Sequence, residues 1–259
     1  MLCTNCGKTI QEGAGFCSEC EANVAEKEPA QPVSNQRGKP KKALILICAV
    51  LVIVLGVGGF FLLGGNNGPE IGEIIQFGGY DWRVLDVDAQ GRALIITENV
   101  IGQRAYHNTW TSVTWESSDI RRYLNGEFYN SFSELDRARI RETTVVNNNN
   151  PWFGTPGGND TTDRIFLLSL EEVVRYFGDS GQLGNQNHNN NEWWGFRDQY
   201  SEYRIARDAS GNPRWWWLCS PGIVDYYVAI VYSDGYVDVY GINMFSASVG
   251  VRPALWLNP

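Results

Sequence analysis

Hydrophobic and polar positions divide the chain into two parts of opposite character. Residues 43–63, ALILICAVLVIVLGVGGFFLL, contain no charged, amide or hydroxyl side chain. A helix rises ~1.5 Å per residue, so this run spans about 30 Å, which matches the hydrocarbon core of a bilayer. A buried core helix is usually shorter and carries a polar stripe. We therefore predict one transmembrane helix at 43–63.

Beyond a spacer at residues 64–72, the pattern becomes that of a folded domain covering residues 73–259. Hydrophobic and polar residues alternate in 74–88 around Gly78–Gly79, and an apolar run follows at 92–101. Alternation with period two predicts β-strands, and the glycine pair predicts the turn between two of them.

Short helices are predicted between the strands. Ile120, Tyr123 and Leu124 have helical spacing, and we expect that helix to end at Gly126. Ser133 is a predicted helix cap before SELDRARI.

Ser169 with Glu172 forms a predicted capping box that starts a further helix. The residues just before it, RIFLLS (164–169), are strand-like. Short, irregularly interleaved helices and strands predict an α+β domain rather than a doubly wound sheet.

Charge predicts the orientation in the membrane. Arg37, Lys39, Lys41 and Lys42 precede the span within a proline-containing linker at 25–42, which places the N-terminus in the cytoplasm and the large domain outside a bacterial cell. From Asn66 onward, 15 arginines face 24 acidic residues, a net charge of −9. This sign argues against a nucleic-acid partner. The oligomeric state stays open.

Residues 1–24 contain two pairs of cysteines and almost no apolar core. Cys3 and Cys6 form one C-x-x-C pair and Cys17 and Cys20 the other. Four thiolates in two such pairs suit structural zinc, and a reducing cytoplasm favours zinc over two disulfides. The segment CTNCGKTIQEGAGFCSEC resembles the zinc-ribbon domains at the N-termini of many bacterial membrane proteins.

Catalytic and further metal sites have weaker support. Two Asn- and Gly-rich stretches, 147–159 and 178–192, are predicted surface loops. Asp160, Asp163 and Asp179 in and near them offer oxygen ligands, so calcium remains an open possibility without a regular calcium-binding loop.

Cys219 stands among apolar residues, which is more typical of a buried side chain than of a nucleophile. We expect no enzyme activity, although an extracellular hydrolase or oxidase remains an alternative.

Five motifs in the outer domain carry a resemblance to a known fold. They are GGYDWRVLDV (78–87), TWESSDIRRYLNGEFYN (114–130), TTDRIFLLSLEEV (161–173), WWLCSPG (216–222) and GVRPALWL (250–257). In this order they resemble bacterial and phage surface domains related to the formylglycine-generating-enzyme subclass of the C-type lectin fold. The enzymes of that fold use two cysteines. Cys219 is the only cysteine of the outer domain, so the resemblance implies the scaffold without the oxidase chemistry.

Many relatives with this C-terminal sequence are variable proteins of diversity-generating retroelements, in which adenine mutagenesis alters the binding surface. Residues 223–248 fit such mutagenesis, since they contain Tyr, Asp, Ser, Ile, Val and Asn but no Lys, Arg, Glu, Gln or Trp. An ordinary hairpin around Ser233–Gly235 explains the same composition, because Tyr, Val and Ile favour strands. Both interpretations remain open.

The predicted function is binding of an extracellular protein or glycan. We expect the side chains that alternate outward around this hairpin to form the ligand-binding face. Those residues are Asp225, Tyr226, Tyr227, Ile230, Tyr232, Tyr236, Asp238, Tyr240, Ile242, Asn243 and Phe245. A membrane sensor that signals through the zinc ribbon is a further alternative.

Overall fold

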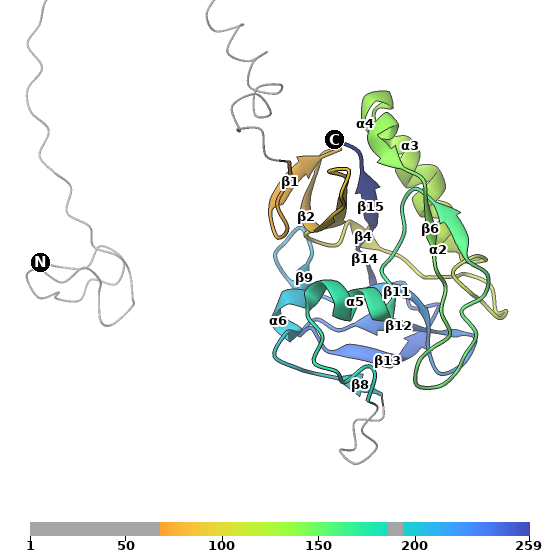
Figure 1. The fold of residues 1–259 in the computed structure, drawn as a ribbon. Coiled ribbons are helices and arrows are strands. Elements are labelled where there is room, and N and C mark those ends of the chain that lie inside the picture. The colour runs from red at the N-terminus through yellow and green to blue at the C-terminus, as the bar shows by residue number, and fades with distance from the viewer. Residues whose placement is uncertain (1–67, 186–193) are drawn as a thin grey trace, which may run out of the picture. The chain divides into compact units, whose positions relative to one another are not determined.

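The computed structural model describes residues 68–185 and 194–259 (Figure 1). The predicted zinc ribbon, linker and membrane span lie outside these residues. No helix within the described residues is both long enough and apolar enough to cross a membrane. Strands predominate and helices are few and short, so the predicted α+β class is confirmed.

Two β-sheets, in which most neighbouring strands are antiparallel, form the body of the domain. The first has the order β1 (Ile74–Phe77), β2 (Tyr80–Val87), β3 (Ala93–Thr97), β15 (Ala254–Leu257) and β5 (Ile140–Arg141). The second has the order β4 (Gly102–Gln103), β14 (Gly250–Val251), β11 (Trp216–Pro221), β12 (Tyr227–Val231), β13 (Val237–Asn243) and β8 (Gly195–Phe196). Two small ribbons complete the strands: β6 (Thr143–Val145) with β7 (Thr161–Asp163), and β9 (Ala206–Arg207) with β10 (Pro213–Arg214).

The predicted first hairpin is confirmed. β1 pairs with β2 across Gly78–Gly79, and both glycines have positive φ angles. β2 then pairs with β3 through a turn in which the Gly91 N–H donates to the Asp88 carbonyl. The indole of Trp82 on β2 is fully buried and donates to the Phe77 carbonyl at 2.8 Å, which fixes the hairpin against the core.

The helices are α2 (Asp119–Tyr123), η1 (Leu124–Phe128), α3 (Tyr129–Ser131), α4 (Glu134–Arg139), α5 (Leu170–Phe177) and α6 (Ser201–Arg204). The prediction that Gly126 ends the first helix is wrong, because α2 continues through the π-helical turn η1 into α3. Leu124 and Phe128 are both buried, so packing of the helix against the core outweighs the low helix propensity of glycine.

Both predicted caps are confirmed. The Ser133 hydroxyl accepts from the Asp136 N–H at the start of α4, and Ser169 with Glu172 forms a complete capping box at α5. The strand-like segment 164–169, however, is not a strand. Residues 165–169 are buried, but the backbone bonds to two different partners: Phe166 bridges Ala254 of β15, while the Leu168 carbonyl accepts from the Cys219 N–H of β11. It therefore connects the two sheets instead of extending either one.

Candidate functional site

An open cleft of about 510 Å3 lies at the β8 edge of the six-stranded sheet. It is lined by Trp194, Arg197, Tyr232, Asp234, Tyr236, Asp238, Tyr240, Gly241 and Ile242, which we call the aromatic cleft. These residues come from β13, from the turn between β12 and β13, and from the residues on either side of β8. The cleft therefore joins side chains that are about 40 residues apart in the sequence.

A close approach of β8 to β13 builds one wall of the cleft. Gly195 pairs with Asp238, and a Cβ at Gly195 would lie 1.9 Å from the Val237 carbonyl oxygen. Only glycine permits this approach without a backbone shift. The Tyr240 N–H donates to the Trp194 carbonyl at 2.6 Å, and the two rings meet edge to face with centroids 4.3 Å apart. Trp194 is still 50 % exposed, so its indole is available to a ligand.

The β12–β13 turn supplies a charged rim. The Tyr232 N–H donates to the Tyr236 carbonyl at 2.8 Å and closes the turn. Asp234, at its tip, forms an ion pair with Arg197. The Arg197 guanidinium carbon also lies 5.8 Å from the centre of the Tyr236 ring, within the range of a cation–π contact.

Asp238 lies buried at the floor of the cleft, with 4 % of its surface exposed. Its carboxylate accepts the Gly241 N–H at 2.9 Å and a hydrogen bond from the Tyr232 hydroxyl. Burial raises the pKa of Asp238 despite these bonds. Burial and the neighbouring Asp238 together raise the pKa of Tyr232 to about 12, so the phenol stays protonated and remains a donor.

A second group of rings, the aromatic stack, lies outside the cleft and consists of exposed Trp110 with the partly buried Tyr226 and Phe245. Trp110 is 68 % exposed and stacks on Phe245 with centroids 5.3 Å apart and on Tyr226 with centroids 5.4 Å apart. Tyr227 connects the two groups, because its ring contacts both Tyr226 and Tyr240.

The structure divides the eleven predicted ligand-binding residues among several places. Tyr232, Tyr236, Asp238, Tyr240 and Ile242 line the aromatic cleft. Four others lie in or beside the aromatic stack: Tyr226, Tyr227, Phe245, and Asn243, whose side chain accepts the Phe245 N–H. Asp225 is exposed and accepts a hydrogen bond from Ser112.

The prediction that Ile230 and Asp238 point outward is wrong, because Ile230 is fully buried and Asp238 almost so. Strand β12 lies between β11 and β13, and Ile230 pairs with Trp217 on one side and Asp238 on the other. The register also shifts between Val228 and Ile230. Simple alternation fails because both sheet faces are covered and a bulge interrupts the hairpin.

Sequence reasoning missed Trp194, Arg197, Asp234 and Gly241 in the cleft. Trp194 and Arg197 join the site through the long-range pairing of β8 with β13, which no local pattern encodes. The one available signal for them was the aromatic and basic segment EWWGFR directly after an Asn-rich loop. Asp234 was treated only as a turn residue.

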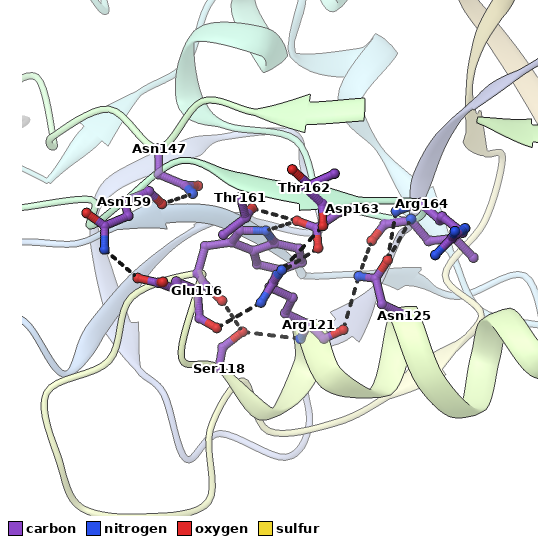
Figure 2. Close-up of polar contacts among 12 residues, drawn as sticks. Glu116, Ser118, Arg121, Asn125, Asn147, Asn159, Thr161, Thr162, Asp163 and Arg164 are labelled. Atoms are coloured by element: carbon purple, nitrogen blue, oxygen red, sulfur yellow. Dashed lines mark hydrogen bonds and ion pairs between the residues drawn. The ribbon is translucent and has the colours of Figure 1, made fainter. Parts of the chain in front are cut away.

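The motifs that carry the family resemblance form a separate polar network (Figure 2). Asp163 of β7 is 2 % exposed and accepts hydrogen bonds from the Trp115 indole at 2.9 Å and the Thr161 hydroxyl at 2.6 Å. It also pairs with Arg121 of α2 at 2.7 Å. The Asn125 amide bonds the Arg164 N–H and the Ile165 carbonyl. This network joins motif 114–130 to motif 161–173.

Other motif residues also form hydrogen bonds that stabilise the fold. The Ser220 hydroxyl accepts the Leu170 N–H at the start of α5. Arg252 is 1 % exposed, and its guanidinium donates to the carbonyls of Thr97, Glu98 and Arg204. Burial lowers the pKa of Arg252 to about 10. Together with the Asp163 network, these contacts make up what we call the motif framework.

Cys219 belongs to the framework as well. Its side chain is 4 % exposed and its carbonyl accepts a hydrogen bond from the Tyr106 hydroxyl. Burial raises the pKa of the thiol well above its ordinary value, with the acidic Glu172 and Glu171 adding to the effect. Cys219 does not line the aromatic cleft, and its environment disfavours the reactive thiolate.

Metal binding was predicted at Cys3, Cys6, Cys17 and Cys20, all of which lie outside the described residues. Within residues 68–185 and 194–259, no three or more His, Cys, Asp or Glu side chains come together in a metal-binding arrangement. Asp163, one of the proposed calcium ligands, is already bonded to Arg121, Trp115 and Thr161.

Comparison with known proteins identifies the family. No curated protein matches the chain, and neither does any solved structure. A family model described as "Domain of unknown function (DUF6273)" matches residues 90–259, which include both the aromatic cleft and most of the motif framework. The chain therefore belongs to the DUF6273 family.

Proposed function

We propose that the chain is a membrane-anchored surface protein that binds a protein or glycan ligand noncovalently in the aromatic cleft. The observation that carries this proposal is the cleft itself. Its volume of about 510 Å3 falls in the range of roughly 300–1,000 Å3 that is typical of ligand sites. Tyrosine and tryptophan supply large contact areas at a low cost in conformational entropy, and four such rings line this cleft.

The construction of the cleft supports binding by a preformed site. Tyr232 is held by Asp238, Arg197 by Asp234, and Trp194 is anchored through its carbonyl to the Tyr240 N–H. A ligand that enters such a site has few side chains left to order, which reduces the entropic cost of binding.

For the fold we propose a C-type-lectin-like domain of the formylglycine-generating-enzyme subclass. Two observations favour it. The last strand, β15, returns to pair with the early strand β3, and segment 164–169 joins that sheet to β11. The zinc ribbon at 1–24 and the membrane helix at 43–63 complete the proposed architecture.

The binding proposal is tested with the labelled full-length chain on arrays of glycans and of purified extracellular proteins. We expect saturable binding to at least one member, and we expect Trp194→Ala and Tyr236→Ala to abolish it. Trp110→Ala is the matched control, since it removes an exposed tryptophan from the aromatic stack and leaves the cleft intact. Absence of any binding, or undiminished binding by Trp194→Ala, would contradict the proposal.

We also propose that residues 223–248 are diversified by a retroelement. The half-exposed tyrosines of this segment suit variation, whereas Ile230 and Asp238 are buried and do not. The neighbouring DNA tests this idea. A reverse-transcriptase gene and an imperfect copy of the codons, differing at adenines, are the expected findings, and an adjacent locus without either would reject it.

A further inference from the structure

Asp238 carries a carboxylate that lacks a counterion. No ion pair of the described residues 68–185 and 194–259 includes it. Its hydrogen-bond donors are the Gly241 and Tyr240 N–H groups and the Tyr232 hydroxyl, and all three are neutral. Burying an uncompensated charge is costly, and a cation placed beside it removes much of that cost.

The other charged groups at the cleft do not supply this cation. Among the described residues that line the cleft, Arg197 is the one basic residue, and it is paired with Asp234 at the rim. These described residues contribute one guanidinium and two carboxylates. Tyr232, Asp234 and Tyr236 of the β12–β13 turn line the cleft together with Asp238, and none of them is basic. The outer part of the chain is also acidic as a whole, with 15 arginines against 24 acidic residues from Asn66 onward.

The rings of the cleft are suited to a cation. The faces of Trp and Tyr rings attract positive charge, most strongly when the cation is partly desolvated. The cleft already contains one such contact, that of Arg197 with Tyr236. Tyr240 lies on the same strand as Asp238, and Trp194 precedes Gly195, which pairs with Asp238. The rings of Trp194 and Tyr240 are in contact, and no arginine of residues 68–185 and 194–259 lies over the half-exposed indole.

We propose that the ligand of the aromatic cleft presents an ammonium group, which binds against Trp194 and Tyr240 with the carboxylate of Asp238 as its counterion. This inference rests on the proposed binding function and specifies the chemistry that the cleft recognises. An anionic ligand is disfavoured by the two carboxylates. A neutral ligand would gain the ring contacts but would leave Asp238 without a counterion.

The test compares two ligands of the same shape and different charge. Choline and its neutral isostere 3,3-dimethylbutan-1-ol are titrated into the full-length chain labelled with 5-fluorotryptophan, in a non-ionic detergent. Fluorine NMR follows the Trp194 signal, which a Trp194→Phe variant assigns. We expect choline to shift this signal saturably and to bind roughly ten-fold more tightly than the alcohol, the scale of a cation–π contact with a partly desolvated ion.

An Asp238→Asn variant sharpens the assignment. It keeps the acceptor for the Gly241 N–H and removes the charge, so the preference for choline over the alcohol should be lost. The Trp110 signal, from the aromatic stack, serves as an internal control and should not move. Equal binding of the two ligands, a shift confined to Trp110, or a choline preference that survives in Asp238→Asn would overturn the inference. The comparison on the unaltered chain decides the matter even if the variant does not fold.

Two further pairs identify the source of the ammonium group. Glucosamine against N-acetylglucosamine represents an amino sugar, and Nα-acetyl-lysine methylamide against its norleucine counterpart represents a protein side chain. Tighter binding of the cationic member of either pair supports the inference and names the source. Array binding that depends on Trp194, without any preference for cationic probes, would reject the inference and leave the proposed binding function standing.

Discussion

The motif framework and the aromatic cleft lie in the same domain but differ in how their polar groups are used. In the framework, Asp163 pairs with Arg121, and Arg252 donates to three backbone carbonyls. Arg204, whose carbonyl is one of those acceptors, pairs with Asp198 at 2.8 Å with both side chains buried. In the cleft, Asp238 is buried with neutral donors alone, and large rings remain half exposed. Satisfied buried groups stabilise a fold, whereas unmatched groups beside exposed rings are typical of ligand sites.

The resemblance motifs and the proposed ligand contacts lie in different parts of the chain. Side chains of motifs 114–130 and 161–173, two of the five that carry the resemblance, bond to one another (Figure 2). The proposed ligand contacts lie outside the five motifs, on a hairpin and a neighbouring strand. Residues that hold a scaffold together do not by themselves specify its ligand.

The largest expected effect comes from breaking the framework. Arg204→Met removes the partner of Asp198 and leaves a buried carboxylate unpaired, so the free energy of unfolding should fall by about 3–5 kcal/mol. Urea denaturation followed by circular dichroism measures the change. A loss below about 1 kcal/mol would mean that this ion pair contributes little to the framework.

A steric change in the cleft wall should reduce both stability and ligand binding. In Gly195→Ala the new Cβ would lie 1.9 Å from the Val237 carbonyl oxygen, so β8 must move away from β13 and the cleft wall with it. We expect a loss of about 1–3 kcal/mol in unfolding free energy and loss of ligand binding. Gly126→Ala is the control, since its Cβ would meet no atom within 4 Å. Unchanged binding in Gly195→Ala would contradict the assigned cleft.

The pH dependence of the two regions should have opposite signs. Burial alone would raise the pKa of Asp198, but hydrogen bonds from Arg204, Ser180 and the Tyr200 N–H outweigh it and lower that pKa. Its stabilising contribution is therefore present above the ordinary value of 3.8 and is lost as the pH falls through the lowered pKa.

Asp238 behaves in the opposite way. Burial raises its pKa, so its contribution to stability is complete below the ordinary value of 3.8 and is lost as the pH rises through the raised pKa. Choline binding should increase over that same rise, because the carboxylate becomes ionised. Carbon NMR titration of the Asp198 and Asp238 carboxyl groups measures the two pKa values. A pKa of Asp238 below that of Asp198 would reverse the comparison.

The smallest effect on stability is expected at the exposed rings. Trp194→Ala should change the free energy of unfolding by less than about 1 kcal/mol, because half of the indole is exposed, while ligand binding is lost. Thermal unfolding and the array assay measure the two quantities on one preparation. A large fall in melting temperature would show that Trp194 supports the fold.

Local features of the fold were predictable from sequence because they depend on neighbouring residues. Turn glycines predicted the first hairpin, and Ser133 and Ser169 predicted their helix starts. The prediction that the helix ends at Gly126 was wrong, because burial of Leu124 and Phe128 continues the helix past this glycine. Segment 164–169 was apolar because it is buried between two sheets, and hydrophobicity alone does not distinguish that from a strand.

The candidate site was predictable only in part. The tyrosines of residues 232–240 were found because they are concentrated in one hairpin. Trp194 and Arg197 come from a distant segment that the pairing of β8 with β13 brings to the hairpin. The burial of Ile230 follows from the strands on both sides of β12. Long-range pairing thus decides which residues of the tyrosine-rich segment face a ligand.

The most direct test of the division between framework and cleft is amide hydrogen exchange of the full-length chain, with and without a ligand selected on the arrays. We predict that bound ligand slows exchange at residues 194–197 and 232–242 and leaves residues 161–173 and 250–257 unchanged. Protection centred on the framework segments, with no change around the cleft, would contradict the account.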